Sequence, residues 1–246
     1  MQDKHLYHLA VDWEKRLSNE LPFFYKIFKE NDSEKILDCA CGTGHHVIAL
    51  ARLGFSASGS DIDPMAIRIA REKAKKEKVS ALFSVADFSN LREYGFKDYD
   101  AVFCVGNSFS LAGSLKKIAR SFLEIHAVLR DGGLFIFQVL NYPRIFRKRD
   151  EWVPAREVDH KKRTHLFLKR FRAKGKRISV LWIHLWREKD KWKAETKESL
   201  LLPLPKSWIA CSLKKAGFRK IRFFGSYQSE KIVPDSRDII VVCQKR

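Results

Sequence analysis

Three acidic residues each follow a short apolar stretch in the first ninety residues: Asp38, Asp61 and Asp87. Asp61 comes nineteen residues after Gly42, near the spacing of about 20 at which an acidic residue reaches a ribose hydroxyl. A carboxylate can accept hydrogen bonds from ribose hydroxyls or from an adenine amino group. A single such Asp is commonly a turn residue or a helix cap, but three at successive strand ends favour a nucleoside site.

A small-residue loop follows the first of these acids, with Ala40, Gly42 and Gly44 at alternate positions. Glycine lets the backbone turn sharply and lets a ligand approach closely. The spacing differs from the G-x-G-x-x-G fingerprint that seats a pyrophosphate on a helix N-terminus. The loop therefore suits a ligand without pyrophosphate, with an amino-acid moiety lying along the turn.

The elements that must position these residues alternate between strand and helix, which is typical of a parallel sheet covered by helices. The pattern predicts strands over 35–40, 56–60, 80–85, 99–105 and, after a turn at 131–133, 134–140; it predicts helices over 44–53, 64–76 and 114–129. Before them, apolar spacing over 7–29, interrupted by Pro22, predicts two short helices.

After Asn141 the pattern changes to an expected antiparallel meander over 164–172, 178–187 and 193–202, then a helix over 206–216 and strands over 220–224 and 238–244. We predict an α/β fold, a Rossmann-like, doubly wound, mostly parallel seven-stranded sheet with a small inserted antiparallel meander. The expected parts are a helical segment 1–31, the core 32–141, the insert 142–204, and a helix and strand hairpin 205–246 that complete the core sheet.

Charge and composition leave two readings open. The net charge is +19, and residues 144–177 hold fourteen Lys or Arg against four Asp or Glu. Such a surface can bind nucleic acid, or it can be an ordinary solvated basic face. Five cysteines without metal or disulfide spacing predict neither a structural metal nor disulfides. The absence of a signal pattern or a membrane-length apolar run predicts a cytoplasmic protein.

Together, these residues resemble the class I S-adenosylmethionine-dependent methyltransferases, whose first motif is a D/E-x-G-x-G-x-G loop; here Ala40 stands at its first glycine. Within that superfamily the chain is similar to the glycine and sarcosine N-methyltransferase-like group. The similarity lies in the segments 40–44, 106–109 (Gly-Asn-Ser-Phe) and 141–142 (Asn-Tyr), with the Ala-Gly-Phe step at 216–218.

The resemblance implies a role for each candidate residue. Asp38, with the loop backbone of Ala40, Gly42 and Gly44, would hold the methionine portion of the cofactor. Asp61 would hold the ribose, and Ile62 would cover a face of adenine. The remaining cofactor contacts would be Asp87 with the Phe88 backbone at the adenine edge, Val105 lining the site, Tyr7 in an N-terminal lid, and Arg16 paired with the cofactor carboxylate.

The chemistry implied is an in-line methyl transfer that yields S-adenosylhomocysteine and needs mainly alignment of the acceptor. Asn107 is the candidate acceptor contact, although a strand-end turn is the alternative. His45 and His46, beside the glycine loop, are expected only to pack. Glycine-methylating relatives carry an arginine and a histidine where this chain has Leu140 and Leu111, so glycine is not the expected acceptor.

For the acceptor, we favour a small molecule, either an amine or an anionic metabolite. The insert lies where the superfamily builds its substrate cover, and its tryptophans Trp152, Trp182, Trp186 and Trp192 can stack on RNA bases or fill a core. RNA is therefore an alternative acceptor. A sensor or scaffold that binds S-adenosylmethionine without catalysis is a further alternative. The oligomeric state is not predicted.

Overall fold

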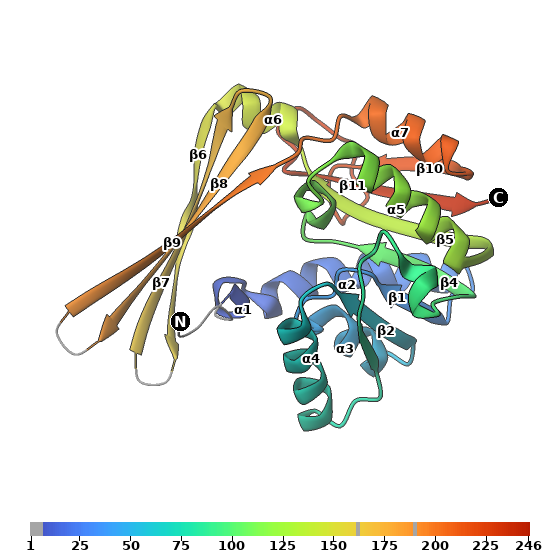
Figure 1. Cartoon of the computed structure of the whole chain (residues 1–246), viewed down its shortest axis with the longest axis horizontal. Helices are drawn as coiled ribbons and strands as arrows, with labels where there is room; N and C mark the ends of the chain where they lie inside the picture. The colour runs from blue at the N-terminus through green and yellow to red at the C-terminus, as the bar shows by residue number, and fades with distance from the viewer. Residues whose placement is uncertain (1–6, 161–162, 189–190) are drawn as a thin grey trace.

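The computed structural model describes residues 7–160, 163–188 and 191–246, and for Tyr7 and His8 only the backbone. Figure 1 shows the order of its elements. The helices are α1 (Tyr7–Ala10), α2 (Trp13–Glu30), α3 (His45–Arg52), α4 (Pro64–Lys76), α5 (Leu115–Val128), α6 (Tyr142–Lys148) and α7 (Lys206–Lys215), with 3-10 turns η1 (Leu91–Tyr94) and η2 (Ser108–Leu111). The strands are β1 (Lys35–Asp38), β2 (Ser56–Asp61), β3 (Leu82–Val85), β4 (Tyr99–Cys104), β5 (Leu129–Leu140), β6 (Asp150–His160), β7 (Arg163–Lys174), β8 (Arg177–Glu188), β9 (Lys191–Leu201), β10 (Phe218–Phe224) and β11 (Asp238–Lys245).

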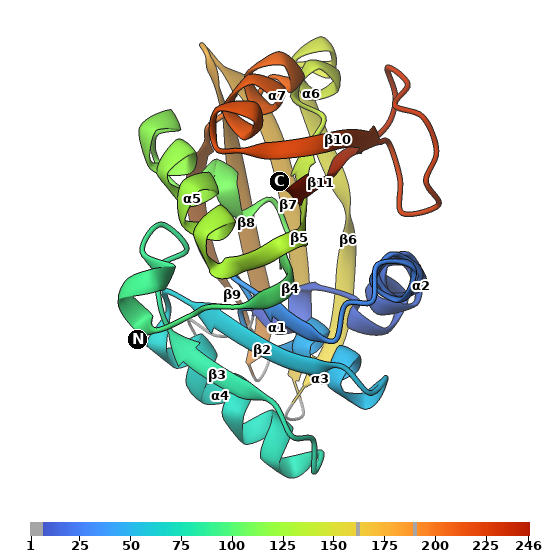
Figure 2. The same ribbon diagram turned by 90° about the vertical axis from the view of Figure 1, so that its right-hand side faces the viewer.

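Seven strands form the core sheet in the order β10-β11-β5-β4-β1-β2-β3, which Figure 2 shows from the side. The neighbours from β3 to β5 run parallel, whereas β11 is antiparallel to both β5 and β10. The strand order reverses between β1 and β4. In open α/β sheets, ligands bind at such a switch point, outside the carboxyl ends of the strands.

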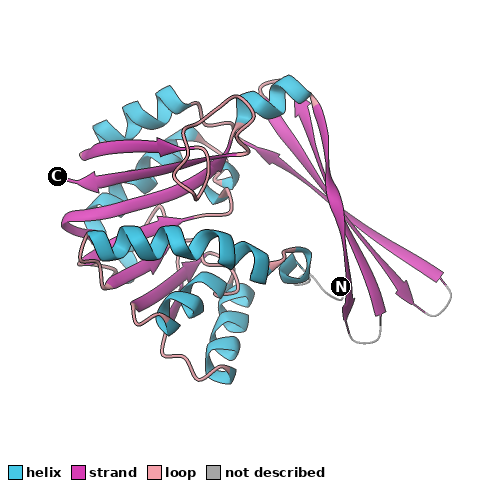
Figure 3. Cartoon of the chain, turned by 180° about the vertical axis from the view of Figure 1, so that it is seen from behind, coloured by secondary structure: helices cyan, strands magenta, loops and turns pink. Residues whose placement is uncertain are grey.

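Two apolar layers cover the core sheet. Residues of α2, α3 and α4 pack with one set of strand side chains, including Ile36, Phe103 and Ile136. Residues of α5 and α7 pack with the opposite set, including Leu37 and Val102. Figure 3, seen from behind, shows α2 lying in front of the sheet, on the face opposite α5 and α7. The predicted doubly wound α/β sheet is thus confirmed.

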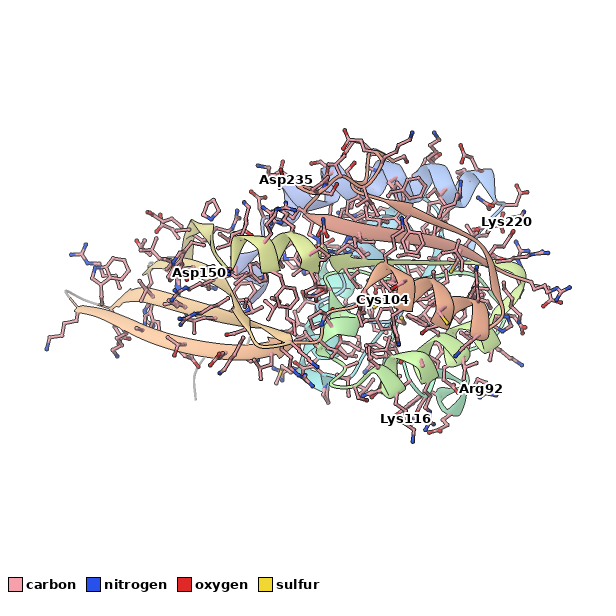
Figure 4. The ribbon with its side chains drawn as sticks, turned by 90° about the horizontal axis from the view of Figure 1, so that it is seen from above. Arg92, Cys104, Lys116, Asp150, Lys220 and Asp235 are labelled. Atoms are coloured by element: carbon pink, nitrogen blue, oxygen red, sulfur yellow. The ribbon has the colours of Figure 1, made fainter. Side chains whose placement is uncertain are left out.

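The insert forms a separate four-stranded antiparallel sheet in the order β6-β7-β8-β9. Its base joins the α5 side of the core through Phe171, Ile178, Val180 and Leu201. The remaining length of its strands extends away from the core sheet (Figure 1). Seen from above, Asp150 lies with this sheet, whereas Cys104 lies in the core (Figure 4).

Two expectations for the elements are wrong. Pro22 does not divide the N-terminal helix, because α2 runs through it from Trp13 to Glu30. Pro22 is exposed, so the carbonyl left without an intrahelical donor can reach water. The meander has a fourth strand, β6, which contains Pro154. Proline disfavours a central strand, but β6 is an edge strand with a register irregularity between Val153 and Arg156.

Smaller differences concern element ends and one helix. The strand β5 begins at Leu129, so it includes the expected turn at 131–133, where the register against β4 shifts. The short helix α6 was not predicted.

Four of the five cysteines are buried and Cys211 is exposed. Within the described part of the chain, no helix has the length and apolarity needed to cross a membrane.

Candidate functional site

The glycine loop after β1 is held by two of the predicted acids. Asp38 is buried, and its Oδ1 accepts a hydrogen bond from the Ala40 amide at 3.1 Å. The Gly42 amide donates to Asp61 Oδ2 at 2.8 Å. A Cβ on Gly44, whose φ is +80°, would lie 2.8 Å from the Phe83 ring, so this position requires glycine. The carboxyl ends of β1 and β2 are therefore joined through the loop.

At the end of β2, Asp61 lies beside an uncovered apolar side chain. Asp61 Oδ1 also accepts from the Asp63 amide at 3.0 Å, so backbone donors orient both carboxylate oxygens. Each oxygen has a further lone pair for a ligand. Ile62 is 64% exposed. An oriented acceptor next to an exposed apolar surface suits a ribose with its attached base.

Asp87, after β3, already has partners that the sequence did not indicate. Its Oδ1 accepts from the Ser89 amide and hydroxyl, both at 2.9 Å, and Lys117 donates to Oδ2 at 2.5 Å. Burial by itself raises the pKa of Asp87, but the hydrogen bonds from Lys117 and Ser89 lower it overall. Asp87 is therefore held as a carboxylate. The neighbouring Phe88 ring packs against Phe109.

The helix α2 carries Arg16 to the carboxyl end of β4. Arg16 Nη2 lies 3.6 Å from the position of a Cβ on Gly106. Arg16 Nε also donates to Glu20 at 2.9 Å. Burial, with the nearby Asp61, raises the pKa of Asp38 to about 8, whereas the Ala40 amide and Arg16 oppose this rise. Arg16 is thus close enough to act on the groups at the switch point.

His45 and His46 both contact α2, and His45 Nε2 also lies 2.6 Å from Lys73 Nζ. His46 is buried, and its Nε2 lies 2.6 Å from Glu20 Oε2. His45 stacks on Trp13 with ring centroids 3.9 Å apart. These contacts hold the N-terminal half of α2 against the first turn of α3. The backbone of Tyr7 begins α1, but its side chain lies outside the described residues.

Asn107 lies at the centre of a buried hydrogen-bond network. Its φ is +64°, and its Oδ1 accepts from Ser110 Oγ at 3.0 Å, the Leu140 amide at 3.1 Å and the Tyr142 hydroxyl at 3.0 Å. The backbone N–H of Asn107 donates to Gln138 Oε1 at 2.9 Å. Asn107 thus has the structural role of a strand-end turn residue. Its side-chain oxygen is occupied, whereas Nδ2 has no hydrogen-bond partner among the described residues.

Two further polar residues that the sequence analysis did not identify lie near this network, Asp238 and Tyr227. Gln138 Nε2 donates to Asp238 Oδ1 at 2.6 Å. The hydroxyl of Tyr227 is buried and has no partner within the described residues. Burial raises the pKa of Tyr227, and Glu20 and Asp238 raise it further. A buried donor without an acceptor among these charged groups suits the polar end of a ligand.

Val105, by contrast, is 5% exposed and belongs to the apolar layer on the α2 side.

The strand-end acids could be found from sequence because they sit at regular positions. Tyr227 and Asp238 carry no such signal, since they come from the far C-terminal part of the chain. No group of metal-ligating side chains occurs among residues 7–160, 163–188 and 191–246.

Residues 36–133 match the family model described as a methyltransferase domain. The glycine/sarcosine N-methyltransferase of Parasynechococcus marenigrum (strain WH8102) is 27% identical over 239 residues, which cover 92% of this chain and 77% of the relative. That of Aphanothece halophytica is 26% identical over 245 residues, covering 96% and 85%. The S-adenosylmethionine-bound structure of CalS10, an amino pentose methyltransferase from Micromonospora echinaspora, has a TM-score of 0.78, 16% identity, and coverage of 100% of this chain and 99% of that one.

The strand order, the loop after β1 and these matches define a class I methyltransferase fold. The protein is an S-adenosylmethionine-dependent methyltransferase.

Proposed function

We propose that the cofactor lies across the carboxyl ends of β1, β2 and β3, and that the acceptor is a small molecule between Asn107 and the insert sheet. The observation that carries this proposal is the convergence of Arg16, Asp38 and Asp61 on the glycine loop. These groups come from three elements. They have the complementary charges that an amino-acid moiety and a ribose require.

In this arrangement Arg16 pairs with the cofactor carboxylate and Asp38 accepts from its ammonium group. Asp61 accepts from the ribose, Ile62 covers the adenine, and Asp87 with Phe88 faces the adenine edge. S-adenosylmethionine supplies a methyl group already activated on a sulfonium. The chain's own residues therefore act mainly by aligning the acceptor and excluding water.

The acceptor side of the site points to a small molecule other than glycine. The names of these relatives refer to glycine, sarcosine and an amino pentose, and none of these is a nucleic acid. Leu140 and Leu111 provide no charge at the two positions where the resemblance to glycine-methylating enzymes implies an arginine and a histidine. The side-chain Nδ2 of Asn107, which has no hydrogen-bond partner among the described residues, can donate to an oxygen of the acceptor.

Calorimetric titration with S-adenosylmethionine of the wild type and of Asp61→Ala tests the cofactor site. The variant loses the ribose acceptor and the bond to the Gly42 amide, so we expect at least about tenfold weaker binding. Asp63→Ala is the matched control. Asp63 caps α4 by accepting from the Met65 amide, and its loss leaves the ribose acceptor in place.

Saturable binding that weakens in Asp61→Ala and not in Asp63→Ala supports the site. A folded wild type that does not bind S-adenosylmethionine contradicts it. Equal binding by the wild type and Asp61→Ala contradicts the assignment of Asp61 alone. Formation of S-adenosylhomocysteine with a set of small amines then identifies the acceptor.

A further inference from the structure

Lys169 is a cationic side chain of the insert, and its ammonium group lies against two aromatic rings. Lys169 lies on β7, opposite Trp182 of β8 and on the same strand face as Phe171. Its Nζ is 4.5 Å from the ring centroid of Trp182 and 4.7 Å from that of Phe171. Lys169 is half-buried. Among the described residues, it has no hydrogen-bond acceptor and no carboxylate within salt-bridge distance.

The charges around Lys169 show which part of the molecule it faces. Burial, with the nearby charges of Arg237 and Arg16, lowers its pKa to about 8, and Asp238 opposes this change. Arg16 also acts on Asp38. Phe171, whose ring lies against Lys169 Nζ, also lines the same cavity as Arg237. Lys169 therefore lies near Arg237 at the start of β11, although it belongs to the insert.

The single acid in this group does not neutralise the cations. Asp238 accepts from Gln138, and burial raises its pKa, which disfavours its negative charge. Lys169 and Arg237 thus leave an excess of positive charge beside the site. A bound sulfonium adds another positive charge, so the repulsion decreases if the acceptor is anionic.

Arg237 borders a cavity next to Phe171. The cavity measures about 90 Å³, and its wall includes Leu140, Arg144 and Arg237. Arg144 is neutralised by a bidentate pair with Glu151 at 2.7 and 2.8 Å. Arg237 has no salt bridge among the described residues. It is therefore the guanidinium on this wall that remains available to a ligand.

We propose that Lys169 and Arg237 form an anion subsite, which holds a carboxylate or phosphate group of the methyl acceptor. This inference rests on the proposed function, because the acceptor must lie beside the cofactor. Lys169 supplies a point charge fixed between two aromatic rings, and Arg237 supplies a planar group with several donors. Recognition of the anionic group then comes from the insert and the segment before β11, while β5 contributes the apolar Leu140.

The test is a titration of the protein saturated with S-adenosylhomocysteine, using inorganic phosphate and acetate in separate experiments at constant ionic strength. We expect saturable binding of at least one anion to the wild type. Lys169→Met and Arg237→Gln should each weaken it by about tenfold or more. Lys176→Met is the matched control, because Lys176 is exposed in the turn between β7 and β8; it should bind as the wild type does.

Binding of acetate indicates an acceptor with a carboxylate, and binding of phosphate alone indicates a phosphorylated acceptor. Absence of saturable anion binding to the wild type overturns the inference, as does equal binding by Lys169→Met. Unchanged binding of S-adenosylhomocysteine by Lys169→Met shows that this variant is folded. If the wild type does not bind S-adenosylhomocysteine at all, the proposed function itself fails.

Discussion

At the scale of single residues, the burial of Asp38 leads us to expect that cofactor binding depends on pH. Its pKa is raised to about 8, so the free protein carries it mostly protonated at neutral pH, whereas a cofactor ammonium favours the carboxylate. We expect the affinity for S-adenosylhomocysteine to increase roughly tenfold or more between about pH 6.5 and about pH 8.5, with release of a proton at the lower pH. Calorimetry in buffers of different ionisation enthalpy measures both quantities.

Asp38→Asn is the control for this prediction. It should bind weakly and lose the dependence on pH that comes from Asp38. In the free protein the raised pKa stabilises the fold below the unfolded value of 3.8, and this contribution is lost as pH increases through about 8. Above that pH, Asp38→Asn should thus unfold at a higher urea concentration than the wild type. An affinity that decreases with pH would contradict the assignment of Asp38.

Two substitutions of Asn107 separate its structural role from its proposed role in binding the acceptor. Asn107→Ala removes the acceptor of three hydrogen bonds, each worth about 0.5–1.5 kcal/mol, so we expect a loss of roughly 2–4 kcal/mol in the free energy of unfolding. Asn107→Asp keeps the accepting oxygen and loses Nδ2. Its carboxyl is buried, which costs free energy, but it still accepts the three hydrogen bonds, so we expect a smaller loss of stability than in Asn107→Ala, while methyl transfer decreases at least about tenfold.

Urea unfolding and formation of S-adenosylhomocysteine in a metabolite extract measure these two effects. Tyr142→Phe removes only one of the three donors to Asn107, so it should be the milder structural variant. Full activity of Asn107→Asp would show that Asn107 only shapes the turn after β4.

At the scale of elements, the N-terminal segment is tied to the insert by one arginine. Arg156 of β6 donates to the Leu9 carbonyl at 3.1 Å and pairs with Asp12 at 2.9 Å. Asp12 also caps α2 by accepting from Lys15. This contact joins the segment before Arg16 to the insert sheet, beside which we propose that the acceptor binds.

Arg156→Gln should therefore loosen α1 with little effect on the rest of the fold, because exposed ion pairs contribute little to global stability. We expect faster amide exchange over 9–12 and a several-fold faster release of S-adenosylhomocysteine in stopped-flow experiments. Arg170→Gln, which breaks an exposed pair with Asp150 on the same sheet, is the control. Unchanged exchange over 9–12 would show that Arg156 does not hold the segment.

For the whole molecule, the relevant property is the net charge of +19. Charge of one sign destabilises a compact state by self-repulsion, and salt screens it. Raising sodium chloride from low to moderate concentration should increase the temperature of unfolding by a few degrees. For a chain of this size, that shift corresponds to about 1 kcal/mol in the free energy of unfolding. Sucrose at matched osmolarity is the uncharged control. A decrease with salt would show that attractive pairs dominate the surface.

The sequence by itself determined the alternation of strands and helices, the two-part architecture and the acids at the strand ends. Asp38, Asp61 and Asp87 could be predicted because hydrophobic periodicity is local, and parallel strands present their carboxyl ends at one edge of the sheet. The continuation of α2 through Pro22 could not be predicted, because it depends on which face of that helix is buried.

Only the tertiary structure decided which distant residues meet at the site. The register of β7 against β8 pairs Lys169 with Trp182. Packing of the insert brings Phe171, beside Lys169, to the cavity that Arg237 lines, and Tyr227 is buried near the charges of Glu20 and Asp238. Asn107 acquired its three donors from η2, β5 and α6. Apart from the local contact of Ser110, these contacts join positions tens of residues apart. They arise from the packing of whole elements, which no local pattern encodes.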